Sequence, residues 1–319
     1  MSPLCSVSID VDPLPCYYRI HGLGPAPDEL RHTVMRRCVP RFSEVLARRG
    51  IRATFFIVAE DVDVDAVGAP AARAIRALLA ELCRDGHEIA SHSHTHPYEM
   101  ARLTAAEVAA EMSRAHELLS EIAGRPVRGF RAPGYDLSRV MMEQLVELEY
   151  LYDSSLFPAP GYYAVKAAVM GVLAVAGRPS GAVLTDPRAL LAPANPYRPS
   201  ASAPWRRGDA PIVELPVAVT RGLRLPVIGT NLLLAPAPLR QRLLESMRRR
   251  PFFNLEMHGI DLADAGADGV PGKLVARQAD LRITVESKLA VFEAILDEVC
   301  RHYDVVTLAE AAEHFARRV

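Results

Sequence analysis

Short runs of apolar and β-branched residues alternate along this chain with longer stretches in which apolar positions recur every three to four residues. Short apolar runs bounded by polar residues are typical of buried strands, whereas the longer period predicts amphipathic helices. We therefore expect strands in the runs at residues 5–12, 53–60, 87–93, 127–134, 150–156, 210–219, 252–259 and 303–311.

Helical patterns fill most of the gaps between these runs. Strands that alternate with helices imply a parallel sheet. About seven such units, with no glycine-rich phosphate loop after the first strand, favour a (β/α) barrel over a doubly wound sheet. Thr104 and Glu107 form a capping box, and Ser138 caps the helix that follows it. The other expected helices cover residues 28–49, 71–85, 239–250 and 285–302.

One long segment interrupts this alternation. Residues 158–210 are rich in proline and small residues, and a structureless loop of that length is uncommon and usually functional. We predict one barrel domain over residues 1–319, with this segment inserted on its rim and one short helix near residues 165–175. A second apolar stretch, punctuated by proline, follows at residues 223–239.

Composition narrows the classes of function. The 319 residues are 50% hydrophobic and carry a formal net charge of -1, so there is no basic excess of the kind that nucleic-acid-binding proteins show. Five scattered cysteines without CxxC spacing predict reduced thiols. No secretory signal is visible, so we expect a cytoplasmic protein. Residues 162–176 are too few to span a bilayer, which takes roughly 20 residues, so we expect a soluble or surface-attached protein.

Residues with catalytic chemistry gather at the expected strand ends. Asp10 and Asp12 end the first strand, and the sequence GHEIASHSHTHP, residues 86–97, surrounds the end of the third. Arg131 ends the fourth strand, and His258 ends the strand before the last. Because catalytic groups in such barrels lie at the carboxyl ends of the strands, we expect these side chains to form one site.

One carboxylate and two imidazoles form a ligand set that suits zinc, with the remaining positions left to water and substrate. Asp12 supplies the carboxylate. His92 and His96 are four residues apart, so they share a face if the chain forms a helical turn there, while His94 points away. His87 would only begin the strand.

Hydrolysis at such a site also needs a base that deprotonates water, an acid for the leaving group and a group that holds the oxyanion. Asp10 is the candidate base and His258 the candidate acid. Arg131 would pair with Asp10 and keep its carboxylate ionised.

Simpler interpretations compete with this one. The histidine cluster also fits a solvated turn, but acids and an arginine at matching strand ends favour a metal site. An amidohydrolase-like HxH site is a rival, although its histidines usually end the first strand, where this chain has aspartates. The acidic run at residues 61–65 lacks the glycine and the glutamate of a calcium loop.

The motifs SIDVD, GHEIASHSHTHP, FRAPG, YDSSLFP, LEMHGID and VVTLAEAAE follow the order and approximate spacing of a known family. The chain resembles the polysaccharide deacetylases (carbohydrate esterase family 4, the NodB homology domain) over nearly its whole length apart from the inserted segment. The resemblance implies an α/β fold with a distorted (β/α)7-type barrel. It also implies removal of N-linked acyl groups from amino sugars with a divalent metal, usually zinc, while cobalt is an alternative.

Each residue that matches a family motif takes its role by this resemblance. The roles are the base for Asp10, the metal ligands for Asp12, His92 and His96, the arginine that orients the base for Arg131, and the general acid for His258. The first motif reads Asp-Val-Asp, whereas many family members have adjacent aspartates.

The remaining motifs depart further from the family. Gly134 stands where the family often has tyrosine, at a position whose backbone N–H contacts the oxyanion, and Tyr135 follows it as a candidate substrate contact. Asp153 and Asp261 each sit where either a substrate contact or a turn cap would lie. The fourth motif, an Asp and Trp pair, has no confident counterpart, and Trp205 is a weak candidate.

We therefore expect a zinc-dependent deacetylase in which Asp10 activates metal-bound water and His258 protonates the departing amine. The substrate would be an N-acylated amino sugar or a glycolipid. The apolar insertion favours a lipid-linked sugar, met at the inner face of the membrane through peripheral contact. A non-catalytic carbohydrate- or lipid-binding protein and a hydrolase of a non-sugar amide are the alternatives. The sequence does not determine the oligomeric state.

Overall fold

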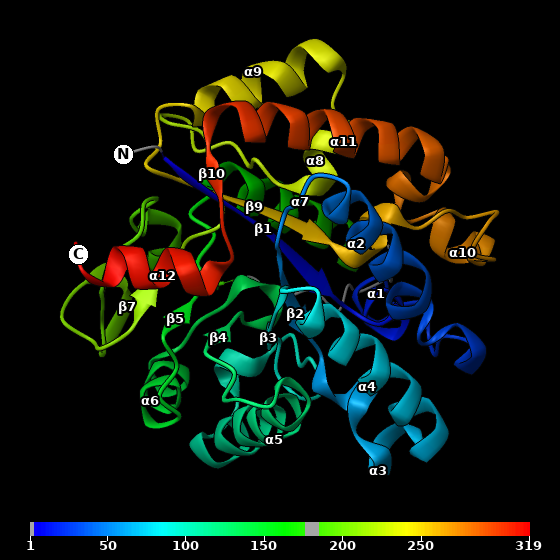
Figure 1. Cartoon of the computed structure of the whole chain (residues 1–319), viewed down its shortest axis with the longest axis horizontal. Helices are drawn as coiled ribbons and strands as arrows, with labels where there is room; N and C mark the ends of the chain where they lie inside the picture. Colours follow the sequence, from blue (N-terminus) through cyan, green and yellow to red (C-terminus); the bar gives the residue numbers. More distant parts are fainter. Residues whose placement is uncertain (1–2, 176–184) are drawn as a thin grey trace.

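The computed structural model describes residues 3–175 and 185–319. A curled sheet of parallel strands lies at its centre, surrounded by helices (Figure 1). Neighbouring strands pair in the order β9-β1-β2-β3-β4-β5-β8, and β10 joins the start of β1. Their bounds are β1 Leu4–Val11, β2 Thr54–Ile57, β3 Glu88–Ser91, β4 Gly129–Phe130, β5 Tyr152–Asp153, β8 Val213–Glu214, β9 Phe252–His258 and β10 Asp304–Val305. The α/β class predicted from the alternation is confirmed, with the sheet forming a half-barrel.

Helices cover the outer face of this sheet. The α-helices are α1 Leu14–Ile20, α2 Val39–Ala47, α3 Val64–Val67, α4 Ala69–Arg84, α5 Ala105–Ala123, α6 Arg139–Glu147, α7 Pro160–Val175, α8 Gly229–Leu234, α9 Ala237–Met247, α10 Gly272–Val275, α11 Val285–His302 and α12 Leu308–Ala316. Short helical turns add η1 Asp28–Leu30, η2 Val34–Cys38, η3 Ala59–Val62, η4 Met100–Arg102, η5 Pro133–Tyr135, η6 Pro187–Leu191, η7 Gly259–Leu262 and η8 Ala279–Arg282. None of the described helices is both long and apolar enough to cross a membrane.

Strand β1 lies between β9 and β2 in the sheet, and all of its residues are buried. Strand β9 pairs with β1 from Leu4 to Asp10, and β10 pairs with Leu4 and Cys5. The last four residues of β1, from Ser8 to Val11, also pair with β2. Because β1 has partners on both sides, its backbone is fixed along its length. The strand therefore holds Asp10, near its end, at a defined height in the sheet.

The predicted capping residues act as expected. Thr104 and Glu107 form a reciprocal capping box at the start of α5, and this helix ends at Gly124 in the left-handed conformation. Ser138 accepts the backbone N–H of Met141 at the start of α6. These caps satisfy backbone groups that the helix ends would leave unpaired.

The helical stretch predicted over residues 28–49 is largely present, but it is not one regular helix. This region contains the short turn η1, the π-helical turn η2 and then α2. Pro40 lies at the start of α2, where it has no N–H to donate and its ring clashes with the carbonyl four residues earlier. A wider π-type turn just before the proline removes that conflict.

The segment over residues 158–210 is more structured than a loop. It contains α7, where the sequence predicts a short helix, then η6 and an antiparallel pair formed by β6 Pro199–Ser200 and β7 Ala203–Arg207. Tyr163 of α7 packs with Tyr135 and Ile228 in an apolar cluster beside the sheet. This segment therefore lies against the loops that follow β4 and β8.

A glycine in β4 offers a test of the packing inside the sheet. Gly129 pairs with Tyr152 of β5, and a Cβ at this position would overlap the buried Tyr152 ring. We expect Gly129→Ala to lower the free energy of unfolding by about 1–3 kcal/mol, as overpacking does elsewhere, measured by urea denaturation. Gly272→Ala is the matched control, because nothing lies within 4 Å of its added Cβ. Equal stability of the two variants would contradict this packing.

Candidate active site

Four strand ends meet at the carboxyl edge of the sheet. Asp10 of β1 pairs in register with His258 of β9. Ser91, the last residue of β3, pairs with Phe130 of β4, so the residues that follow them, His92 and Arg131, are neighbours. The structure thus brings together the strand-end residues that the sequence singles out.

Asp12, His92 and His96 form a group that could hold a metal ion. The Nε2 atoms of His92 and His96 lie 3.2 and 3.3 Å from the same carboxylate oxygen, Oδ1 of Asp12. Within the described residues this buried oxygen has no hydrogen-bond partner. Nδ1 of His92 lies 2.7 Å from the Arg131 carbonyl, which orients its ring toward Asp12. The donor set and this supporting contact both fit a divalent transition metal.

The local environment favours the metal-binding forms of Asp12 and His96, but not that of His92. Burial opposes the charge of Asp12, but His96 and His92 outweigh it and hold the pKa of the carboxyl well below its usual value. Burial lowers the pKa of His96, which favours the neutral imidazole that a metal needs. Burial also disfavours the charged form of His92, yet Asp10 and Asp12 raise the pKa of this residue overall.

A bend, and not the predicted helical turn, brings His92 and His96 together. Ser93 and His96 have φ values of 65° and 58°, in the left-handed region. The N–H of His96 donates to Oγ of Ser93 at 3.1 Å, which closes the bend. His94 turns away from the group, as expected, and its Nε2 lies 3.0 Å from Asp63. A left-handed conformation costs a non-glycine residue on the order of 1–3 kcal/mol, and such residues cluster at functional sites.

Asp10 is held by a buried ion pair. Nη1 of Arg131 donates to Oδ1 of Asp10 at 2.5 Å, and both side chains are almost completely buried. The remaining donors of Arg131 reach Ser8 and Ser154, and its guanidinium lies over the ring of Phe56. Arg131 itself does not line the pocket. Its contact with Asp10 fixes the orientation of this carboxylate.

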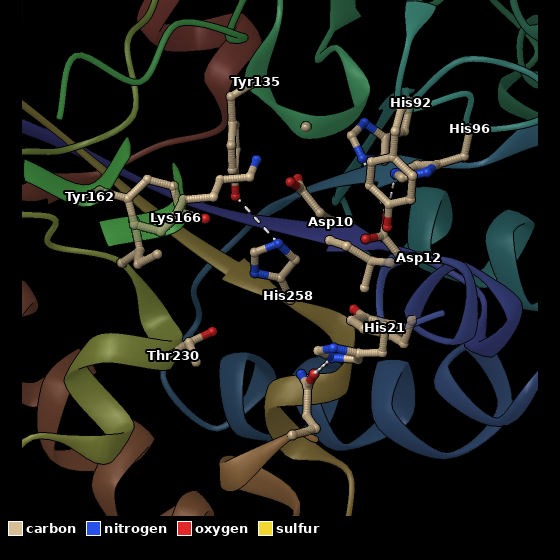
Figure 2. Close-up of a pocket in the computed structure, with 16 residues that line it drawn as sticks. Asp10, Asp12, His21, His92, His96, Tyr135, Tyr162, Lys166, Thr230 and His258 are labelled. Carbon is tan, nitrogen blue, oxygen red and sulfur yellow. Dashed lines mark hydrogen bonds and ion pairs between the residues drawn. The ribbon is translucent and has the colours of Figure 1, made fainter. Parts of the chain in front are cut away.

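His258 lies at the end of β9, across from Asp12 and its histidines (Figure 2). Its Nε2 is 3.3 Å from the hydroxyl of Tyr135, and its Nδ1 is 3.0 Å from Oε1 of Glu256. Burial alone would lower the pKa of His258, but Glu256, Asp10 and Asp261 raise it to about 9. The imidazole is therefore protonated at neutral pH and has a proton to give.

Sequence reasoning missed Glu256. This carboxylate is fully buried, and burial raises its pKa. A signal was present, because residues two apart on a strand share a face, so Glu256 had to lie on the same side of β9 as His258. A glutamate inside an otherwise apolar strand needs a partner when it is buried, and His258 is that partner.

Gly134 and Tyr135 follow β4 and lie on the pocket wall. Both have left-handed backbone conformations, with φ values of 69° and 62°. This sharp turn directs the Tyr135 ring toward His258, as Figure 2 shows. Glycine adopts this conformation without strain, whereas tyrosine does so at a cost.

A pocket lies over these groups, with Asp10 between His258 and the metal-binding group (Figure 2). Its walls come largely from segments that the sequence did not mark as functional. The lining residues are Asp10, Asp12, Tyr17, Ile20, His21, His92, His96, Tyr98, Gly134, Tyr135, Tyr162, Lys166, Ile228, Thr230, His258 and Gln278. Tyr162 and Lys166 belong to α7, so the inserted segment contributes directly to the pocket.

Besides Arg131, three candidates named from the sequence lie outside this pocket. Asp153 is buried in β5, where it accepts the Ser155 hydroxyl at 2.6 Å and pairs in register with Glu214. Asp261 accepts the backbone N–H of His258 at 2.9 Å, so it acts as the turn cap that was one of its two expected roles. Trp205 of β7 stacks on Arg188 instead of approaching the site.

Comparison with known proteins agrees with this geometry. Residues 28–152 match the family model described as polysaccharide deacetylase. This stretch of the chain is similar to that family. The chain is similar to a polysaccharide deacetylase-type protein of known structure from Mycobacterium smegmatis, with a TM-score of 0.60 and 19% identity, covering 98% of this chain and 91% of that one. This likeness shows the fold.

A curated relative is the peptidoglycan deacetylase of Helicobacter pylori. The two are 21% identical over 155 residues, which are 48% of this chain and 49% of the relative. The match thus spans about half the length of the relative.

The metal-binding group can be tested by thermal unfolding with and without added Zn²⁺. We expect Zn²⁺ to raise the Tm of the wild-type protein, because a ligand that binds only the folded state stabilises it, by about 4 kcal/mol at a thousand times its Kd. Asp12→Ala and His92→Ala should lose this shift and the zinc found by elemental analysis. His94→Ala is the matched control and should keep both, because His94 contacts Asp63 instead. A shift that persists in Asp12→Ala would exclude this ligand set.

Proposed function

We propose that this chain is a zinc-dependent hydrolase that removes an N-acyl group, in the simplest case N-acetyl, from an amino sugar. The observation that carries the proposal is the placement of two groups with opposite tasks in one pocket. A carboxylate, Asp10, is held by Arg131, and an imidazole whose pKa is raised, that of His258, lies opposite it in the register of β1 and β9. A binding protein has no need for this pair.

Asp10 is the base in this proposal. Its Oδ1 is engaged by Arg131, which leaves Oδ2 to accept a proton from water. A divalent metal held by Asp12, His92 and His96 would supply Lewis acidity toward that water and the amide carbonyl. Arg131 keeps the Asp10 carboxylate from rotating, and precise placement of a base accounts for much of its effect.

His258 is the acid. Its Nδ1 faces Glu256, so Nε2 is the nitrogen that presents a proton toward the pocket, beside the hydroxyl of Tyr135. When the C–N bond of the amide breaks, this proton passes to the leaving nitrogen, and the products are a carboxylic acid and a free amine. The backbone at Gly134 is the candidate donor to the oxyanion.

The roles of Asp10 and His258 can be tested by acetate release from a panel of N-acetylated amino sugars. We expect Asp10→Asn and His258→Gln each to lower kcat/KM by about 100-fold or more, the usual effect of removing a general base or acid. Zinc content should stay near that of the wild type, because neither residue belongs to the group formed by Asp12, His92 and His96. His94→Ala serves as the active control. Undiminished activity of Asp10→Asn would refute the proposed base.

Glu256→Gln tests how the acid is tuned. The negative charge of Glu256 favours the protonated form of His258. Its removal should lower the pKa of His258, so the alkaline limb of the pH–kcat/KM profile should move to lower pH. Activity above this limb should fall, while activity on the acidic side is less affected. A merely structural loss would reduce activity equally at every pH and leave the limb in place.

A further inference from the structure

Exposed apolar side chains are concentrated in one part of the chain. Among the described residues, eight large apolar side chains are exposed, and six of them lie between residues 165 and 239. These six are Val165, Leu191, Leu223, Leu225, Leu234 and Leu239. Contiguous exposed apolar surface on a folded protein usually marks a contact site.

The segments that carry these side chains pack against one another. One apolar cluster joins α7, the end of η6 and the chain around residues 217–228. Nη1 of Arg224 donates to the carbonyls of Leu190 and Ala192, each at 3.0 Å, on either side of Leu191. The turn that carries Leu223 is therefore attached to the segment that carries Leu191.

A tight turn presents the most exposed of these residues. Val219 and Pro226 form an antiparallel bridge, and the N–H of Thr220 donates to the carbonyl of Leu225, so residues 219–226 form a hairpin. Leu223 at its tip is 79% exposed, and Leu191 on the segment that Arg224 contacts is 76% exposed. These leucines are held outward by a fixed backbone, although burying one typically gains about 1.5–3 kcal/mol.

This part of the chain is also strongly basic. Residues 187–250 contain eleven arginines and three acidic residues, a net charge of about +8, although the whole chain has a net charge of -1. Several of these arginines bind backbone carbonyls, but Arg221, Arg242 and Arg249 are exposed and have no ion-pair partner in the part of the chain that the structure describes. Arg221 directly precedes the hairpin tip.

We propose that the surface formed by Val165, Leu191, Leu223 and Leu225 with Arg221, here called the rim surface, docks on an anionic lipid bilayer. Aliphatic side chains that enter the acyl boundary, flanked by basic side chains that meet lipid phosphates, are the features of interfacial membrane binding. The exposed side chains are aliphatic, whereas the cores of protein interfaces are enriched in aromatic residues. The uncompensated arginine charge selects an anionic partner.

The rim surface borders the pocket. Helix α7 exposes Val165 and lines the pocket with Tyr162 and Lys166, and the chain that leaves the hairpin lines it with Ile228 and Thr230. Docking would therefore place the pocket close to the lipid headgroups. Membrane docking goes beyond the proposed deacetylation and does not require it, because binding is measured without turnover.

Flotation of the full chain with vesicles tests this proposal. We expect binding to phosphatidylglycerol vesicles, weak binding to pure phosphatidylcholine vesicles, and a decrease in binding as salt increases. Leu191→Asp with Leu223→Asp should weaken binding to phosphatidylglycerol by about tenfold or more, since each change removes a buried leucine and adds a repelled charge. Arg221→Glu should weaken it as well.

Val64→Asp is the matched control, because Val64 is an exposed valine on α3, outside the rim surface, and this variant should bind like the wild type. The Tm and zinc content of every variant should match the wild type, which separates lost docking from lost folding or a failed active site. Absence of binding to phosphatidylglycerol, or equal binding to phosphatidylcholine, would overturn the proposal. So would variants that alter self-association and leave vesicle binding unchanged, because the rim surface would then join copies of this chain.

Discussion

The Arg131 guanidinium is completely buried inside the curled sheet, where a charge without partners would cost several kcal/mol. Each of its nitrogens therefore has an acceptor: Asp10 on β1, and Ser8 and Ser154 beside it. These contacts connect the ends of β1 and β4 with the chain that follows β5. The same contacts that make a buried arginine tolerable also fix the carboxylate that we propose as the base. Stability and the proposed catalysis therefore involve one set of hydrogen bonds.

That set is possible because the inner face of the sheet is polar near its carboxyl edge. Along β1, Ser6, Ser8 and Asp10 alternate with Cys5, Val7 and Ile9, which belong to the main apolar core. Along β9, Asn254, Glu256 and His258 alternate in the same way with Phe253, Leu255 and Met257. Since side chains alternate between faces along a strand, each strand supports the outer core with one half of its residues. The other half builds the site, and Asn254 bridges Ser8 and Ser154 within it.

This alternation also explains which parts of the site the sequence could predict. The positions of Asp10, Arg131 and His258 follow from strand ends, because a parallel sheet brings its carboxyl ends to one edge. Glu256 was predictable by the same reasoning, but its strand was interpreted as apolar core. The bend at Ser93 and the π-helical turn before Pro40 depend on local backbone conformations that apolar periodicity does not encode. The pocket walls supplied by α7 were not predictable, because contacts between distant segments decide them. Asp153 is the opposite case. Its place near a strand end suggested a functional residue, but its side chain is buried inside the sheet.

The negative charge of Asp12 in the metal-binding group is not balanced in the same way. Arg131 balances Asp10 with a permanent positive charge, but Asp12 faces only two imidazoles, and its Oδ1 accepts no hydrogen bond from the described residues. The imidazoles can balance the carboxylate by taking up a proton, and the raised pKa of His92 reflects this. A divalent cation satisfies the carboxylate and both nitrogens at once, so cation and protons compete for the same atoms. Acid should therefore weaken metal binding, because protons compete with the cation for the imidazole nitrogens. The charge of Asp10 is thus balanced by Arg131, whereas the charge of Asp12 is balanced by the protons or the cation that this group binds.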